Sequence, residues 1–235
     1  MKRKVVILFL FLSHSVFSQE KGVNAFVIDY SYQIPSGILN EKFSNNSAIG
    51  INYFKKNNTN FFYGLKANYL FGANIKDSTI FNAISTDEDF VIDGNGTYSN
   101  IILLQEGFSS HLYIGYALEL KENNPNGFYF SVGLGFLQHR IFIDTKNQYI
   151  PQLSNDYKKG YDQLSNGLST QFNIDYMILE EKKTFKFFTG IDYTLGFTRN
   201  RRAYDFNNMN VVNKSIRYDK LLGFHIGLII PINRK

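Results

Sequence analysis

The sequence predicts an all-β fold, an eight-stranded antiparallel transmembrane β-barrel with long extracellular loops. Three observations predict it: an export signal, eight segments in which apolar and polar residues alternate, and connections that alternate between short and long. Successive side chains of a strand point to opposite faces, so alternation gives each segment one apolar and one polar face. Repeated behind an export signal, this pattern is typical of a barrel whose outer surface meets lipid.

The start of the chain has the three parts of a secretory signal peptide. Residues 2–4 are basic, residues 5–12 form an apolar run too short to cross a bilayer as a helix, and Ser18 supplies a small residue before the cut. We therefore predict a signal peptide at 1–18 and one barrel domain at 19–235. Export would follow the general secretory route to the outer membrane of a Gram-negative bacterium.

The charge balance depends on removal of this leader. The full chain has 25 Lys and Arg against 20 Asp and Glu, and three of the basic residues lie in the leader. The exported chain keeps 22 basic and 20 acidic residues, which is too even for nucleic-acid binding, so we predict no nucleic-acid partner. The absence of Cys excludes disulfides and thiolate metal sites.

The first four strands are predicted at residues 24–34, 47–54, 61–71 and 108–120. Each has large apolar side chains on one parity and small, polar or charged ones on the other. In strand 61–71, for example, Tyr63 and Leu65 alternate with Gly64 and Lys66. The outward residues of the other three strands are Phe26, Ile28, Tyr30, Tyr32, Ile49, Ile51, Tyr53, Leu112, Ile114, Tyr116 and Leu118.

The last four strands are predicted at 128–143, 168–179, 185–197 and 221–232. Strand 128–143 is the longest, and its outward parity becomes polar at Gln138 and Arg140, so we expect it to continue beyond the bilayer. The other outward residues follow the same alternation: Phe128, Phe130, Val132, Leu134, Phe136, Phe172, Ile174, Tyr176, Ile178, Phe185, Phe187, Ile191, Tyr193, Leu195, Phe197, Leu222, Phe224, Ile226, Leu228 and Ile230.

The connections support a barrel independently. Those at 55–60, 121–126 and 180–184 are short, and the second ends in the turn formers Asn124-Pro125-Asn126, followed by Gly127. Those at 35–46, 72–107, 144–167 and 199–217 are long. This alternation is typical of an outer-membrane barrel with short periplasmic turns and longer external loops. Eight strands enclose a lumen filled by side chains, which excludes a general diffusion porin.

The inward parity contains charged residues, and these could form a proton path, a catalytic cluster or only a paired polar core. We favour the paired core, because both signs occur and the charges are spread over many strands. The residues are Asp29, Lys66, His111, Glu119, Asp175, Lys186, Asp192 and His225.

We predict no catalytic residue, no metal and no cofactor. In Ser109-Ser110-His111, adjacent residues face opposite sides, and Ser109 and His111 share the lumen, away from the lipid A that some eight-stranded barrels modify. His139 near Asp144 is too small a cluster for a protease site. The acidic run 87–89 and Asp93 lack the ligand order of a calcium loop, so we expect a solvated acidic loop.

The long loops contain the candidate binding residues. Arginine side chains suit phosphates and carboxylates, and aromatic side chains with Arg are enriched at protein interfaces. The arginines could therefore bind lipopolysaccharide or an acidic partner, or pair with the acidic run 87–89. The predicted partner- or lipopolysaccharide-binding residues are Arg199, Arg201, Arg202, Arg217, Tyr161, Tyr204 and Phe206.

With these residues in view, the chain resembles the small eight-stranded outer-membrane β-barrels of the OmpX, OmpW and PorT type. Segments 133–139, 159–162 and 196–202 read as fixed motifs of a narrower, poorly characterised subgroup. The end of the chain departs from the terminal Phe common in such barrels, since it reads Ile232-Asn233-Arg234-Lys235.

The resemblance implies a non-enzymatic accessory or scaffold subunit of an outer-membrane protein assembly or secretion complex. Its partners would be outer-membrane lipid, lipopolysaccharide, and other outer-membrane proteins or lipoproteins. A lipid A-modifying enzyme and a surface adhesion or lipopolysaccharide-binding barrel are the alternatives.

Overall fold

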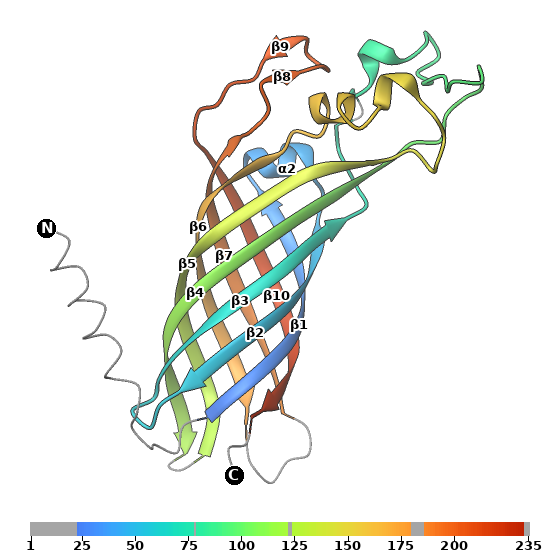
Figure 1. Ribbon diagram of the computed structural model, residues 1–235. Helices are drawn as coiled ribbons and strands as arrows, with labels where there is room; N and C mark the ends of the chain where they lie inside the picture. Colours follow the sequence, from blue (N-terminus) through green and yellow to red (C-terminus); the bar gives the residue numbers. More distant parts are fainter. Residues whose placement is uncertain (1–22, 78, 122–123, 180–185, 233–235) are drawn as a thin grey trace, which may run out of the picture.

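The computed structural model describes residues 23–77, 79–121, 124–179 and 186–232, and it confirms the predicted eight-stranded antiparallel transmembrane barrel (Figure 1). The ring order is β1-β10-β7-β6-β5-β4-β3-β2, so the first and last strands are neighbours. The predicted leader at 1–18, the connection at 180–184 and the final residues 233–235 lie outside the described residues.

All eight predicted strands are present. They are β1 (Val23–Ser36), β2 (Asn46–Lys56), β3 (Phe61–Gly72), β4 (Ile102–Lys121), β5 (Asn124–Asp144), β6 (Ser165–Ile178), β7 (Phe187–Asn200) and β10 (Arg217–Pro231). The ring is closed by continuous pairing of β1 with β10, from Ala25 opposite Pro231 to Ser36 opposite Lys220. Closure leaves no unpaired sheet edge, which lipid would not tolerate because it offers no hydrogen-bond partner.

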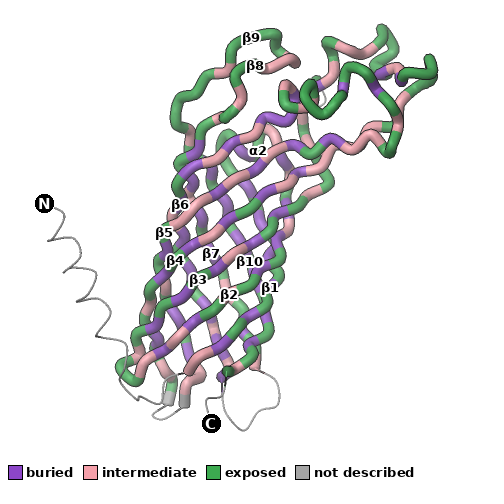
Figure 2. The backbone as a smooth tube through the Cα atoms, in the orientation of Figure 1, coloured by how far each residue is buried: buried purple, intermediate pink, exposed green. Residues whose placement is uncertain are grey.

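The predicted outward parity is confirmed on every strand over the described residues, and Phe185, predicted to face outward, lies outside them. Figure 2 shows buried and exposed residues alternating along the barrel. Leu112, Leu134 and Leu168 are 68%, 68% and 73% exposed, respectively. A continuous belt of exposed Phe, Tyr, Ile and Leu is far larger than the apolar patches of soluble monomers, and it matches the lipid-facing surface of a membrane barrel.

Four strands start three or more residues earlier than predicted, and β6 and β10 are two of them, at Ser165 and Arg217 instead of 168 and 221. β4 begins at Ile102, not at 108, because its first residues pair with the far end of β5, down to Ile102 opposite Asp144. An ion pair between Arg140 Nη2 and Glu106 Oε2 at 2.5 Å lies across this extension. β5 begins at Asn124, so Pro125 and Asn126 belong to the strand and not to the predicted turn. Pro is tolerated there because it lies at the strand end.

The long connections all lie at one end of the barrel and fold together (Figure 1). They are the first, second, third and fourth outer loops, residues 37–45, 73–101, 145–164 and 201–216, and we call them together the cap. They contain α2 (Ile38–Lys42), the short 3-10 helices η1 (Asn82–Ile84), η2 (Pro151–Leu153) and η3 (Tyr157–Gly160), and the hairpin of β8 (Tyr204–Asp205) and β9 (Asn210–Val211).

Among the described residues, no helix has the length and apolar character needed to cross a membrane.

Leu134→Arg should destabilise the barrel in lipid by about 2–4 kcal/mol, because it places a charge on the lipid face near mid-strand. Unfolding by urea in lipid vesicles, followed by gel mobility of unheated samples, measures this loss. Ile216→Arg is the matched control, because Ile216 is 52% exposed but lies in the fourth outer loop, in water. Equal stability of the two variants would contradict the assignment of the apolar belt to lipid.

Candidate functional site

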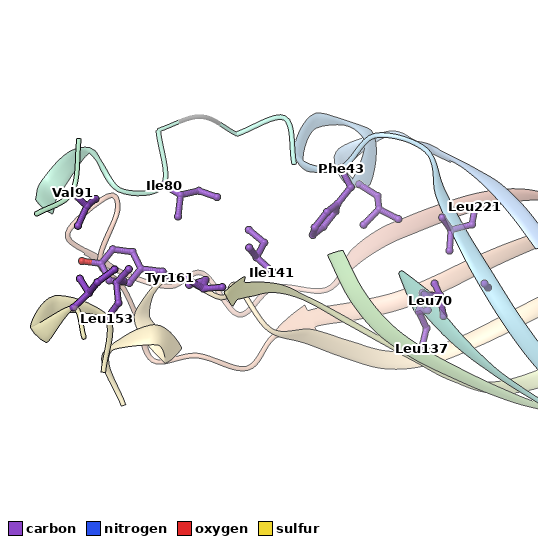
Figure 3. Close-up of a cluster of buried hydrophobic side chains, with 13 residues drawn as sticks. Phe43, Leu70, Ile80, Val91, Leu137, Ile141, Leu153, Tyr161 and Leu221 are labelled. Carbon is purple, nitrogen blue, oxygen red and sulfur yellow. The ribbon is translucent and has the colours of Figure 1, made fainter. Parts of the chain in front are cut away.

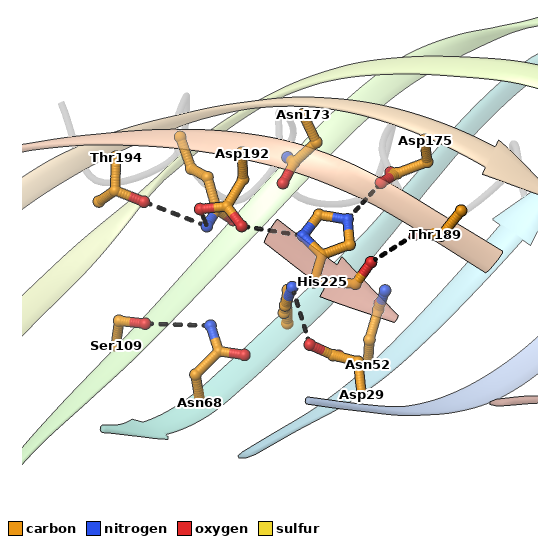
Figure 4. Close-up of polar contacts among 12 residues, drawn as sticks. Asp29, Asn52, Asn68, Ser109, Asn173, Asp175, Thr189, Asp192, Thr194 and His225 are labelled. Carbon is orange, nitrogen blue, oxygen red and sulfur yellow. Dashed lines mark hydrogen bonds and ion pairs between the residues drawn. The ribbon is translucent and has the colours of Figure 1, made fainter. Parts of the chain in front are cut away.

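The lumen of the barrel contains the predicted paired polar core (Figure 4). His225 lies between two carboxylates, with Nε2 2.5 Å from Asp175 Oδ1 and Nδ1 2.9 Å from Asp192 Oδ1. Lys66 Nζ is 3.2 Å from Asp29 Oδ2. The hollow that remains beside His225 and Lys66 has a volume of only about 20 Å³, roughly the space of one water molecule. This volume cannot pass a solute.

The lumenal Ser and His residues that were considered for catalysis have separate partners. Ser109 Oγ accepts a hydrogen bond from Asn68 Nδ2 at 3.1 Å, and His111 Nε2 is 2.8 Å from Ser169 Oγ. His111 is 1% exposed, so its side chain faces the lumen and not the lipid. His139 is also turned inward, and it pairs with Asp219 at 2.8 Å and not with Asp144.

Above this polar region, an apolar cluster fills the mouth of the barrel and continues into the cap (Figure 3). Phe43 of the first outer loop lies over the mouth, with its ring edge-on to His139 at a centroid distance of 5.5 Å. Burial of each large apolar side chain stabilises the fold by about 1.5–3 kcal/mol. The cluster, which we call the cap core, consists of Leu39, Phe43, Ala48, Leu70, Ile80, Val91, Leu137, Ile141, Ile143, Ile150, Leu153, Tyr161 and Leu221.

The third and fourth outer loops are joined by an ion pair at the edge of the cap core. Arg202 Nε donates to Asp162 Oδ1 at 2.7 Å, and Nη2 donates to Asp162 Oδ2. Backbone bonds run beside the pair, from Arg201 N to Leu164 O at 2.8 Å and from Phe206 N to Gly160 O at 3.0 Å. A Cβ on Gly160 would overlap the Phe206 ring, so this close approach requires Gly. Two of the sequence motifs, 159–162 and 196–202, therefore meet here.

The third motif contributes to a buried polar cluster at the same level. Asp219 Oδ2 accepts hydrogen bonds from His139 and from the Thr198 hydroxyl, and Arg217 Nε is 3.4 Å from Asp219 Oδ1. Asp219 is fully buried. The motif ending at His139 and the one containing Thr198 are thus linked through β10, which explains part of their composition by packing and charge.

The structure does not bring the seven predicted binding residues into one surface. Arg202 and Arg217 are engaged in the ion pairs above, and Tyr161 and Phe206 pack together with a centroid distance of 5.4 Å. Tyr161 is 4% exposed, and burial raises the pKa of its hydroxyl. The members that remain exposed are Arg199, Arg201 and Tyr204, which we call the arginine rim. Binding by this rim stays a prediction.

Within the described residues, no carboxylate of the acidic second outer loop forms an ion pair with an arginine of the fourth loop. Arg202 pairs with Asp162 of the third loop instead. Asp93 Oδ1 accepts backbone N–H bonds from Asn95 and Thr97, both at 2.9 Å, and these bonds lower the pKa of Asp93. Asp93 therefore stabilises its own turn. No cluster of His, Asp and Glu that could hold a metal ion occurs in the part of the chain that the structure describes.

The cap also carries an aromatic group that is not among the predicted binding residues. Phe90 and Tyr98 stack at a centroid distance of 4.5 Å, and Gly94 of the same loop donates its N–H to Tyr149 O at 2.8 Å. Phe90, Tyr98 and Tyr149 are 45%, 58% and 73% exposed. We call these three residues the aromatic platform. Their position in loops with no regular alternation left no periodic signal in the sequence.

Comparison with known proteins adds similarity of fold only. No protein-family model matches the chain, and no curated protein has a significantly similar sequence. The chain is similar to the crystal structure of Neisserial surface protein A (TM-score 0.44, 9% identity, covering 89% of this chain and 97% of that one). It is also similar to Ail, the attachment invasion locus protein of Yersinia pestis (TM-score 0.44, 8% identity, 89% and 99%). A second Ail structure, in complex with the heparin analogue sucrose octasulfate, gives a TM-score of 0.42 at 8% identity, with the same coverage.

Arg202→Ala should loosen the contact between the third and fourth outer loops, because it leaves the buried Asp162 carboxylate without its cation. Loss of a charged hydrogen bond costs about 1.5–3 kcal/mol, so amide exchange at 160–163 should accelerate by about tenfold or more. Hydrogen exchange with mass spectrometry measures this rate. Arg201→Ala is the control, because Arg201 is exposed and its Nε donates to an amide, Asn166 Oδ1, at 2.5 Å. Similar exchange in both variants would contradict a structural role for the Arg202–Asp162 pair.

Proposed function

We propose that this chain is a non-enzymatic integral outer-membrane barrel that docks a partner protein at the cell surface through its cap. In the finer form of this proposal, it is an accessory or scaffold subunit of an outer-membrane protein assembly or secretion complex. Three properties support the proposal: a filled lumen, a cap with its own core, and the exposed aromatic platform.

The filled lumen argues against transport. Lys66 pairs with Asp29 and His225 pairs with Asp175 in the lumen, and the hollow beside them has a volume of about 20 Å³. The apolar cap core then covers the mouth above them. With the lumen filled and its mouth covered, we expect the protein to act by binding at its outer surface.

Hydrogen bonds between the outer loops restrict the conformation of the cap. The second and third outer loops are joined by the Gly94–Tyr149 backbone bond and by Asn100 N donating to Gln148 Oε1 at 2.6 Å. The first and second loops are joined by Lys76 N donating to Lys42 O at 2.9 Å. Loops tied in this way lose less conformational entropy on binding than free loops do.

The observation that carries the proposal is the exposure of the aromatic platform. A cap with a large core nearby could bury such rings, yet Phe90, Tyr98 and Tyr149 remain 45–73% exposed on joined loops. Aromatic side chains supply much of the binding energy of protein interfaces, because they bury a large area with few rotatable bonds. The flanking carboxylates, including Glu88, which accepts a hydrogen bond from the Tyr98 hydroxyl at 3.1 Å, favour a basic rim on the partner.

Crosslinking at the platform tests the docking proposal. A photoreactive phenylalanine analogue placed at Tyr149 in intact cells should give one discrete protein adduct, and Tyr98→Ala in the same chain should reduce its yield by about tenfold if Tyr98 is an interface hot spot. The analogue placed at the lipid-facing Leu134 is the control.

Three results separate the alternatives. An adduct from Tyr149 that disappears with Tyr98→Ala supports docking at the platform. A discrete adduct from Tyr204 but none from Tyr149 would contradict the platform and favour the arginine rim. Absence of protein adducts at both positions, in barrels that assemble normally, would contradict docking altogether.

A separate prediction concerns the lipid A-modifying alternative. Ser109→Ala should leave lipid A structure unchanged, because the Ser109 hydroxyl bonds to Asn68 and not to a His. Mass spectrometry of lipid A from cells with the wild-type chain, the variant or a gene deletion measures this. A change in lipid A in the deletion strain that Ser109→Ala reproduces, at normal protein abundance, would contradict the non-enzymatic proposal.

A further inference from the structure

A second feature of the cap is a hollow of about 460 Å³, on the side where the β8–β9 hairpin lies. It is bounded by α2, the end of β7, the start of β10 and the fourth outer loop. Its lining has two basic residues, Lys42 and Arg217, one acidic residue, Asp205, and four asparagines, Asn200, Asn208, Asn210 and Asn213. Asn200 Oδ1 and Asn213 Oδ1 each accept a backbone N–H bond, and Asn208 Nδ2 donates to Asp205, which leaves the other polar atom of each of these amides. Amides can both donate and accept hydrogen bonds, as sugar hydroxyl groups require.

Lys42 is a cation without a carboxylate partner. It lies at the end of α2, half-buried, and its Nζ donates to Gln163 Oε1 at 2.5 Å. In the described part of the chain, no carboxylate forms an ion pair with it. Burial, followed by the like charge of Arg217, lowers the pKa of Lys42. An ammonium group in this setting gains from an added anion.

The acidic groups near Lys42 are already engaged. Asp205 accepts hydrogen bonds from Asn207 N at 2.9 Å and Asn208 Nδ2 at 3.0 Å, and Asp77 accepts from the backbone N–H and hydroxyl of Thr79. The third, Asp219, is fully buried and is shared by His139, Thr198 and Arg217. The three negative charges still act on Lys42 and oppose the lowering of its pKa, but none of the three carboxylates forms an ion pair with it.

Arg217 is fixed in position below the hollow. Its Nε is 3.3 Å from Thr198 Oγ1 and 3.4 Å from Asp219 Oδ1. These contacts hold the guanidinium without using all five of its N–H donors. A fixed guanidinium beside a lysine is a usual arrangement for binding phosphate.

We propose that this hollow binds a phosphorylated saccharide, with the phosphate between Lys42 and Arg217 and the sugar hydroxyls against the asparagine amides. The site goes beyond the docking function, because it lies away from the aromatic platform and needs no partner protein. The sugar phosphate can belong to a soluble saccharide or to a lipid headgroup of the outer leaflet, and the two sources present the same chemistry to the hollow.

Calorimetric titration tests the site. The whole protein, in nanodiscs of zwitterionic phospholipid, is titrated with glucose 6-phosphate and, separately, with glucose. We expect binding of the phosphate ester and at least about tenfold weaker binding of glucose, because loss of a charge-assisted hydrogen bond corresponds to about one order of magnitude in Kd. Lys42→Gln should weaken the phosphate ester by a similar factor, and Lys42→Arg should retain most of the affinity.

Lys214→Gln is the matched control, because Lys214 is exposed on the fourth outer loop, which bounds the hollow, but does not itself line the hollow. Asn210→Asp adds a negative charge at an exposed lining position and should weaken binding even if Lys42→Gln folds poorly.

Discs that contain lipid A distinguish the two sources of the sugar phosphate. Loss of the glucose 6-phosphate signal in these discs indicates a lipid headgroup, and an unchanged signal indicates a soluble saccharide. No binding by the wild-type protein in zwitterionic discs, or equal weakening by Lys42→Gln and Lys214→Gln, would overturn the proposal.

Discussion

The constraint on which the rest of this structure depends is that lipid offers the backbone no hydrogen-bond partner. Every strand must then pair on both sides, and only a closed ring such as the one sealed by β1 and β10 satisfies all of them. Closure commits alternate residues to lipid and to a narrow lumen. The ion pairs of Lys66 with Asp29 and of His225 with Asp175 follow, because inward polar groups have no bulk water to solvate them. Inward glycines make room for them: a Cβ on Gly223 would overlap the Asp192 carboxylate.

The strands that contact lipid could be predicted from the sequence, whereas the contacts within the cap could not. The eight strands and their parities could be predicted, because the apolar solvent imposes a period of two that shows in a single sequence. In the cap that period is lost, and contacts are set by partners far apart in the chain. Arg202 and Asp162 are 40 residues apart, and Lys42 and Gln163 are 121 apart. The charges of the long loops could be read from the sequence, but their pairing within the cap could not.

The same limit explains why the predicted site residues divide as they do. Composition suggested that arginines and aromatic residues in the loops act together on the surface. In the structure, Tyr161 and Phe206 are partly or fully taken up by the cap core, and Arg202 joins two loops. Arginine and aromatic side chains that stabilise the cap are of the same types as those that bind partners. The two groups differ in whether they are buried, and burial can be determined only from the folded structure.

The cap core contains residues in and next to the strands that close the barrel, so its completion depends on closure of the ring. Leu39 lies in α2, which follows β1, and Leu221 lies in β10, so the core contains residues from both sides of the closing seam. The β1–β10 pairing joins the two ends of the chain, and contacts of such long sequence separation form late because of their loop-closure entropy. A barrel that is still open would therefore lack a complete cap core. The outer surface would therefore reach its final shape only when the ring has closed.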